Sequence, residues 1–154
     1  MDNKILFLLV FLLTSLTVNA QNTVIKAGHF FDARNGKMLE NQIIVIQDGK
    51  IKEIGINPKF SDTDRIIDLS NSWVLPGLMD CHVHITDNLP HRNIQIEQMY
   101  ANESTSLRAI RGTVVAKQFL NNGFTTIKEI GNDANYATAD IIKAINRGWI
   151  QGPT

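Results

Sequence analysis

The first half of the chain has the hydrophobic pattern of β-structure. Between residues 23 and 75, short apolar and β-branched runs alternate with stretches rich in Gly, Asp, Asn and Ser. These runs predict strands over residues 24–31, 42–47, 50–54, 65–69 and 73–75. Asp48-Gly49 separates two of the runs and favours a tight hairpin, because both of its turn positions require a positive φ. The regular spacing of the turns indicates a small antiparallel sheet or half of a β-sandwich.

The second half of the chain has the pattern of alternating strands and helices. Apolar runs predict strands at residues 78–85 and 125–130, and apolar residues at helical spacing predict helices over 104–120 and 140–147. Asn122-Gly123 favours a helix end, because Gly readily adopts the left-handed conformation. The apolar stripe of the first helix is expected to comprise Leu107, Ile110, Val114, Val115, Phe119 and Leu120. Such alternation is typical of parallel α/β structure.

The N-terminus has the pattern of a secretory signal peptide. Lys4 precedes an apolar run over residues 5–13, and a more polar stretch ends in Val18-Asn19-Ala20, the small-residue pattern at which signal peptidase cuts. The apolar run is about half of the ~20 residues needed to span a membrane. We therefore expect residues 1–20 to be removed, leaving Gln21 as the new N-terminus. The mature protein is expected to be exported, periplasmic or secreted, without a membrane anchor.

The net charge and the cysteine content limit the classes of partner and the thiol chemistry that are expected of this chain. The chain has 15 Lys and Arg against 15 Asp and Glu, a formal net charge of +0. Because no excess of charge attracts phosphate backbones, we expect no nucleic-acid partner. Cys81 is the single cysteine, so neither an intramolecular disulfide nor a CxxC motif can form. In an exported protein a lone thiol is expected to be buried rather than exposed.

Candidate chemistry is concentrated in residues 80–84. Alternate side chains of a strand point to the same face, so Asp80, His82 and His84 are expected to share one face. Two neighbouring imidazoles are costly to bury unless they bind something, and a divalent metal binds neutral imidazole nitrogen. Zinc is the default ion for a nitrogen-rich site, although carboxylates from elsewhere would favour manganese, iron or nickel. The alternative is two ordinary strand histidines, since a His-x-His pair alone is a weak motif.

The position of the histidine pair favours the metal interpretation. The pair ends the first strand of the α/β half, and functional residues of parallel barrels lie at the C-terminal ends of the strands. The two remaining histidines of the chain do not lie at the end of a predicted strand of the α/β half. His29 is expected to be a packed or surface residue of a strand, and His91 a solvated loop residue rather than a substrate contact.

Three motifs carry a resemblance to the metal-dependent amidohydrolase superfamily. The run VLPGLMDCHVHI, residues 74–85, is similar to the signature that opens the barrel of that superfamily. IIVIQDGKIKEIG, residues 43–55, resembles its hairpin, and NNGFTTIKEIG, residues 121–131, resembles its second barrel strand. The closing residues 140–154 are most similar to the imidazolonepropionase-like and Xaa-Pro dipeptidase-like branch. The resemblance extends over residues 24–154.

The resemblance implies a fold and a division into domains. The expected fold is α/β, a small N-terminal β-sandwich-like sheet followed by the first βα units of an incomplete (β/α)8 TIM-like barrel. Residues 1–20 would be the signal peptide, residues 21–75 the N-terminal β-domain and residues 76–154 the start of the barrel. The family's remaining metal ligands lie on later strands, and about 79 residues follow Leu75, whereas a complete barrel takes ~250. The chain is therefore expected to be the N-terminal part of a hydrolase and inactive on its own.

The resemblance also implies a site and a reaction. His82 and His84 would be two ligands of a centre with one or two divalent metal ions, most simply zinc, that hydrolyses an amide, a cyclic amide or a dipeptide. The implied partner is thus a small-molecule or dipeptide substrate. Asp80 would either hold an imidazole in its tautomer or line the barrel floor, and Glu129 would be a structural or supporting carboxylate rather than a catalytic base. Two alternatives remain: a non-catalytic metal-binding or interaction module derived from an amidohydrolase, and an unrelated secreted scaffold with an incidental histidine pair.

Overall fold

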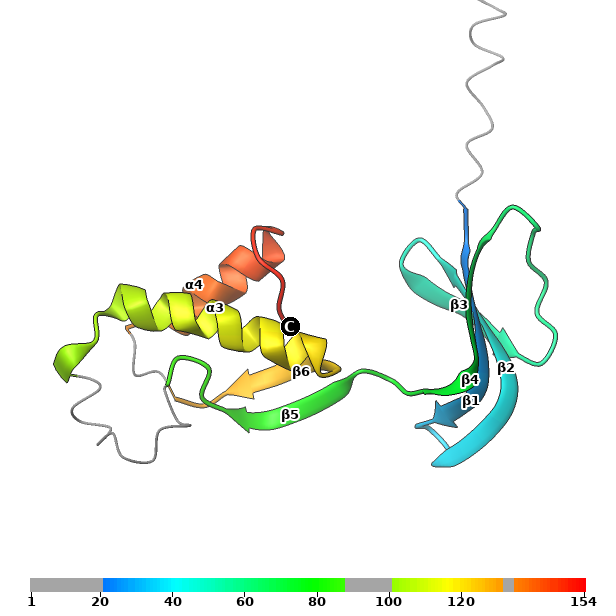
Figure 1. Ribbon diagram of the computed structural model, residues 1–154, viewed down its shortest axis with the longest axis horizontal. Coiled ribbons are helices and arrows are strands. Elements are labelled where there is room, and N and C mark those ends of the chain that lie inside the picture. The colour runs from blue at the N-terminus through cyan, green and yellow to red at the C-terminus, as the bar shows by residue number, and fades with distance from the viewer. Residues whose placement is uncertain (1–20, 88–100, 132–134) are drawn as a thin grey trace, which may run out of the picture. The chain divides into compact units, whose positions relative to one another are not determined.

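The computed structural model describes residues 21–87, 101–131 and 135–154 (Figure 1). The expected signal peptide and His91 therefore lie outside the described residues. The chain divides into two compact units, the first ending at Pro76 and the second spanning Gly77–Thr154. Within the described ranges, no helix has both the length and the apolar character needed to cross a membrane.

The first unit contains one sheet of four strands. They are β1 Thr23–Asp32, β2 Lys37–Gln47, β3 Lys50–Gly55 and β4 Arg65–Val74, in the spatial order β3-β2-β1-β4 (Figure 1). The β1–β2 and β2–β3 pairs are antiparallel hairpins, as their short connections require. The Asp48-Gly49 turn is confirmed, because both residues have positive φ, 51° and 73°. The β-structure predicted for this half is therefore present.

The direction of β4 differs from the prediction of an antiparallel sheet. β4 pairs with β1 in parallel, so the sheet is mixed. A tight turn dictates an antiparallel partner, whereas the longer connection over residues 56–64 carries the chain past two strands to the far edge. The two strands predicted at 65–69 and 73–75 form one continuous strand, with a register shift opposite Gly28. In the described part of this unit there is no second sheet of a sandwich.

Buried cross-strand pairs hold this sheet together. Val24 on β1 lies opposite Val45 on β2, and both side chains are fully buried. Burying a side chain of this size stabilises the fold by roughly 1.5–3 kcal/mol. At the other edge, His29 on β1 stacks on Trp73 of β4 with ring centroids 4.6 Å apart. His29 is thus a packed strand residue, as predicted.

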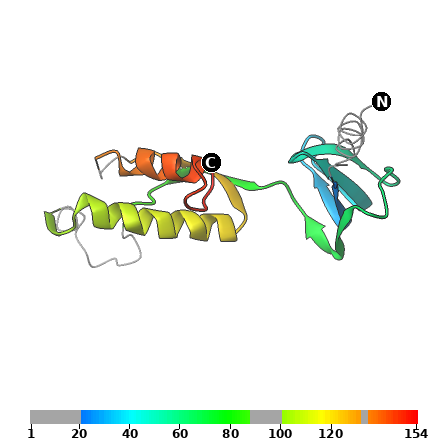
Figure 2. The ribbon, with the colours of Figure 1, turned by 90° about the horizontal axis from the view of Figure 1, so that it is seen from above.

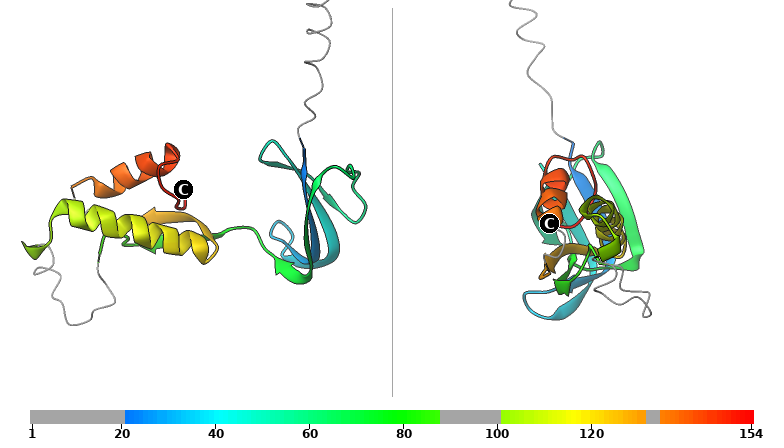
Figure 3. Two further views of the ribbon diagram at one scale, coloured as in Figure 1. Left: turned by 45° about the horizontal axis from the view of Figure 1, so that its top comes forward. Right: turned by 90° about the vertical axis from the view of Figure 1, so that its left-hand side faces the viewer.

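The second unit consists of strands and helices in alternation. Its elements are β5 Leu78–Val83, α3 Thr105–Asn121, β6 Phe124–Glu129 and α4 Ala137–Asn146. β5 and β6 are parallel neighbours, so α3 is the crossover between them, and α3 and α4 lie side by side (Figure 2). Both helices cover the same face of the two strands (Figure 3). The predicted strand–helix alternation is therefore confirmed.

The edge of β6 that faces away from β5 is also hydrogen-bonded. The backbone N–H of Thr154 donates to the carbonyl of Thr125 at 2.9 Å, and the N–H of Ile127 donates to the carbonyl of Thr154 at 3.0 Å. Two bonds from one residue to partners two apart are the pattern of parallel strands. β6 is thus flanked by parallel neighbours on both sides.

Small residues, rather than the predicted apolar stripe, bring α3 onto the core. Val83, Ile85, Ala116 and Ile141 form the buried cluster, and α3 faces it with Arg108, Gly112 and Ala116. A Cβ at Gly112 would lie 2.5 Å from Ile141 Cδ1, so the contact depends on the missing side chain. Of the predicted stripe, Val115 and Phe119 do pack against the cluster, whereas three members are exposed: Leu107, Ile110 and Val114. The pattern missed this face because glycine, alanine and arginine do not register as apolar.

Candidate functional site

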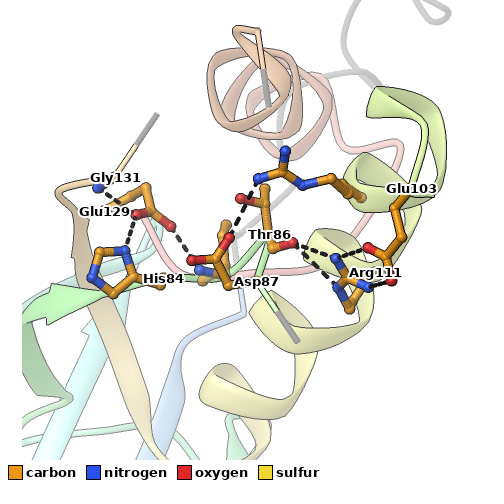
Figure 4. Close-up of polar contacts among 9 residues, drawn as sticks. His84, Thr86, Asp87, Glu103, Arg111, Glu129 and Gly131 are labelled. Carbon is orange, nitrogen blue, oxygen red and sulfur yellow. Dashed lines mark hydrogen bonds and ion pairs between the residues drawn. The ribbon is translucent and has the colours of Figure 1, made fainter. Parts of the chain in front are cut away.

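The candidate site lies where β5 and β6 end together. Val83 and Glu129, the final residues of the two strands, are partners in the parallel ladder. His84 follows β5 directly, so its side chain emerges beside Glu129 and near Gly131 (Figure 4). The sequence therefore places a histidine, a carboxylate and a glycine at one edge of the parallel pair, the edge at which barrel enzymes carry their functional groups.

His82 and His84 lie side by side at this edge. Their ring centroids are 5.3 Å apart and the rings are nearly perpendicular, at 77°. His82 is exposed, whereas the His84 side chain is half-buried, with 31% of its surface accessible. The side chains of residues two apart point the same way, as expected from strand geometry. The structure thus brings together the two residues predicted as metal ligands.

Asp80 and Cys81 lie on the same strand, and the structure favours one of the two roles left open for Asp80, a polar residue that does not orient an imidazole. Asp80 Oδ1 accepts a hydrogen bond from the backbone N–H of His82 at 3.0 Å, so the carboxylate contacts the backbone and not an imidazole. Cys81 is exposed, so the expectation of a buried thiol is wrong. The reason is that the core covers β5 only near its end, at Val83, while Met79 and Cys81 before it remain accessible.

Glu129 clamps the two strand ends. Its side chain is only 8% exposed. Oε2 accepts a hydrogen bond from the backbone N–H of Ile85 at 2.6 Å, and Oε1 accepts one from the N–H of Gly131 at 2.8 Å. Oε1 also lies 3.3 Å from Nδ1 of His84, a buried ring nitrogen that makes no hydrogen bond among the described residues. These are the contacts of a structural carboxylate, in line with the interpretation of the second-strand motif.

Gly131 makes room for the His84 ring. A Cβ at this position would lie 2.6 Å from His84 Nδ1 and 3.0 Å from Cε1, closer than real Cβ contacts come. Any larger residue would therefore displace the ring or the backbone. The sequence indicated Gly131 only as the end of a strand motif, and nothing local in the sequence shows which ring it faces.

The segment after His84 is fixed to α3 by two arginines. Arg111 donates from Nη2 and Nε to the carbonyl oxygen of Thr86 (Figure 4). Arg108 Nη2 lies 3.4 Å from Asp87 Oδ1 in a buried ion pair. Arg111 also pairs with Glu103 at 2.6 Å, and this guanidinium holds the pKa of the Glu103 carboxyl below its usual value. Sequence reasoning missed both arginines. The available signal was Arg108 four residues before Gly112, on the helix face of small residues.

The histidine pair fits two positions of a metal shell. A zinc–nitrogen bond of about 2.0 Å places the centroid of a coordinated imidazole about 3.2 Å from the ion, so two such rings at a tetrahedral angle are about 5.2 Å apart. The observed separation of 5.3 Å matches that arrangement. It is also the spacing of an ordinary edge-to-face ring pair, so the spacing permits a metal without requiring one. Residues 21–87, 101–131 and 135–154 contain no group of three His, Cys, Asp or Glu that could complete a site.

Comparisons with known proteins converge on one family for this segment. The model of the amidohydrolase family matches residues 73–154, more than half of the chain. A dihydroorotase from Trichlorobacter lovleyi is 38% identical over 66 residues, which are 43% of this chain and 15% of that protein. An imidazolonepropionase from Clostridium tetani is 43% identical over 58 residues, 34% of this chain and 14% of that protein. The chain thus spans about a seventh of the length of the curated relatives it matches.

Solved structures of other proteins are similar to this chain over most of its length. A Xaa-Pro dipeptidase with bound methionine in its active site superimposes with a TM-score of 0.71 at 31% identity, covering 86% of this chain and 32% of that one. The ochratoxinase of A. niger gives a TM-score of 0.71 at 26% identity, covering 88% and 30%. With the family model matching the segment that carries both histidines, the chain belongs to the amidohydrolase family.

Proposed function

We propose that this chain supplies two metal ligands, His82 and His84, to a metal-dependent hydrolase that cleaves carbon–nitrogen bonds in small molecules. The observation that carries the proposal is the pairing of the two rings, 5.3 Å apart, at the end of a strand inside the family segment. Hydrolysis of carbon–nitrogen bonds is supported at the level of the family. Zinc is the ion we propose, because two neutral imidazoles suit it.

The substrate we propose is an amide, a cyclic amide or a dipeptide. The names of two relatives support this class of substrate: the imidazolonepropionase and the Xaa-Pro dipeptidase. For the fold, we propose that residues 76–154 form the first β/α units of a (β/α)8 barrel. The parallel pairing of β5, β6 and Thr154 supports that arrangement, since each strand of such a barrel has a parallel neighbour on both sides.

His82, His84 and Glu129 would have distinct parts in this function. When bound, a divalent ion polarises a carbonyl and lowers the pKa of water. His82 and His84 would hold it through ring nitrogens. Glu129 would fix the backbone on both sides of the site by accepting from Ile85 and Gly131.

We further propose that the protein is exported, on the basis of the sequence pattern of residues 1–20. An exported hydrolase of this kind would act on substrates outside the cytoplasm.

Metal content tests the proposed function. The test uses the complete barrel enzyme that contains this chain, called the full-length protein below. In it, His82→Ala and His84→Ala should each remove most of the zinc found by elemental analysis. Turnover of a panel of dipeptides and cyclic amides should fall together with the zinc content. His29→Ala is the matched control, because His29 also stacks on a ring but lies in the first sheet. Its metal content should equal that of the wild type. Retention of both metal and turnover by the two site variants would refute the proposal.

A further inference from the structure

Glu129 joins the two strand ends through both of its oxygens. Each oxygen accepts one backbone N–H, from Ile85 after β5 and from Gly131 after β6, and the side chain is 8% exposed. The carboxylate is therefore held in one orientation by two donors that cannot rotate away. In that orientation Oε1 faces Nδ1 of His84 at 3.3 Å. A rigidly held acceptor thus lies beside one particular nitrogen of one of the two imidazoles.

The chemistry of a carboxylate selects which ring nitrogen carries the hydrogen. An ionised carboxylate only accepts hydrogen bonds, so at 3.3 Å it favours a hydrogen rather than a lone pair on the nitrogen that faces it. In a neutral imidazole the other nitrogen, Nε2, then keeps its lone pair. Gly131 contributes to the same placement, because a side chain there would collide with Nδ1 and Cε1. Glu129 and Gly131 together fix the position of the ring and turn its free lone pair away from Glu129.

We infer that Glu129 is the positioning residue that presents Nε2 of His84 to the metal, an inference that rests on the proposed function. Carboxylates that orient a metal-binding histidine in this way raise metal affinity by holding the ligand ready. From the sequence, Asp80 and Glu129 are both candidate supporting carboxylates, and Asp80 contacts the backbone N–H of His82. The carboxylate that faces an imidazole is therefore Glu129 on the neighbouring strand, and not Asp80 on the strand of the histidines.

Glu129→Gln in the full-length protein tests the inference. A glutamine side chain has one acceptor oxygen, so its amide nitrogen must face either a backbone donor or Nδ1 of His84. The zinc dissociation constant, measured by competition with a chromophoric chelator, should rise by about 10- to 100-fold. The absorption spectrum of the cobalt-substituted protein should keep its shape, since both imidazoles still bind. His84→Ala, which removes a ligand, should change that spectrum.

Asp80→Asn is the matched control. It removes a carboxylate beside the same histidine pair but keeps an oxygen that can accept from the N–H of His82. Its zinc affinity should equal that of the wild type. Equal weakening by Asp80→Asn and Glu129→Gln would overturn the assignment, because it would show a general effect of negative charge rather than positioning.

The two proposals fail in different ways. Retention of zinc by His82→Ala and His84→Ala would refute the proposed function itself. Loss of zinc in those variants with unchanged affinity in Glu129→Gln would leave the function standing and overturn the role of Glu129. Urea unfolding of the metal-free variants shows whether Glu129→Gln folds. If it does not, Gly131→Ala decides, because it keeps the carboxylate and displaces the same ring: weaker zinc binding is expected, and unchanged binding overturns the inference.

Discussion

Arg111 and Thr86 are joined by a forked hydrogen bond, with Nη2 and Nε of the guanidinium 2.7 and 3.2 Å from the Thr86 carbonyl oxygen. Thr86 is buried and lies two residues after His84. The guanidinium also pairs with Glu103. The segment that follows His84, a proposed metal ligand, is therefore anchored to α3. The same hydrogen bonds hold His84 in position and stabilise the second unit.

Arg111→Lys should destabilise the second unit. Lysine keeps the charge but lacks the planar fork, so it cannot serve the Thr86 carbonyl and Glu103 together. We expect a loss of about 1.5–3 kcal/mol in the free energy of unfolding, measured by urea denaturation. Lys143→Gln is the control, because Lys143 pairs with Asp140 on an exposed surface. That change should cost less than about 0.5 kcal/mol. Equal effects of the two changes would contradict the anchoring role of Arg111.

The Glu103–Arg111 pair should make stability depend on acid pH. The hydrogen bond from Arg111 lowers the pKa of Glu103 in the folded state. The folded protein therefore binds this proton less readily than the unfolded chain, and the stabilisation is complete above the ordinary pKa of 4.5 and is lost as the pH falls through the folded-state pKa. Glu103→Gln should flatten this part of the stability–pH curve. In an Arg111→Gln background the same change should have no such effect, and a persisting effect would exclude the pair as its source.

Local signals in the sequence predicted the elements of this fold well. Asp48-Gly49 requires positive φ at both turn positions, and Gly123 ends α3 with a φ of 89°, so single residues dictated these boundaries. The histidine pair was also visible, because the period of a strand alone places His82 and His84 on one side. These features are determined by residues close together in the chain, so the sequence alone is enough to predict them.

The features that the sequence did not reveal depend on distant partners. Glu129 and His84 are separated by 45 positions, and only the register of β5 and β6 brings them together. The parallel direction of β4 likewise follows from a long connection that no turn motif controls. The buried face of α3 contains Gly112 and Ala116, whose value is their small size against Ile141, a property that a hydrophobicity pattern does not detect.

The burial pattern of α4 gives a paired test of the core. Ile141 is 3% exposed within the cluster of Val83, Ile85 and Ala116, whereas its neighbour Ile142 is 51% exposed. Ile141→Ala should lower the free energy of unfolding by about 2–5 kcal/mol, because it removes buried contacts and leaves a cavity. Ile142→Ala should cost less than about 1 kcal/mol, because its side chain is half in solvent already. The reverse order in urea denaturation would show that α4 packs through the other face.

Export can be tested through the N-terminus of the mature protein. Expression in a bacterium should yield protein that begins at Gln21, since Val18 and Ala20 have the small side chains that signal peptidase selects. Mass spectrometry of the periplasmic and secreted fractions measures this directly. Ala20→Phe, which puts a large side chain at the cleavage position, should block processing. Protein that retains Met1 in those fractions would contradict the prediction.

Two glycines of the first sheet should respond to the same substitution in opposite directions. A Cβ at Gly28 would overlap the backbone carbonyl of Ser70 on β4, at the register shift between β1 and β4, and a backbone group cannot rotate aside. Gly28→Ala should therefore lower the free energy of unfolding by about 1–3 kcal/mol. Gly55 at the end of β3 has open space around its Cβ position and no positive φ, so Gly55→Ala should raise stability by about 0.4–1 kcal/mol through the lower entropy of the unfolded chain. Urea denaturation of the two variants measures both changes, and a neutral Gly28→Ala would mean that β4 does not pass this close to β1.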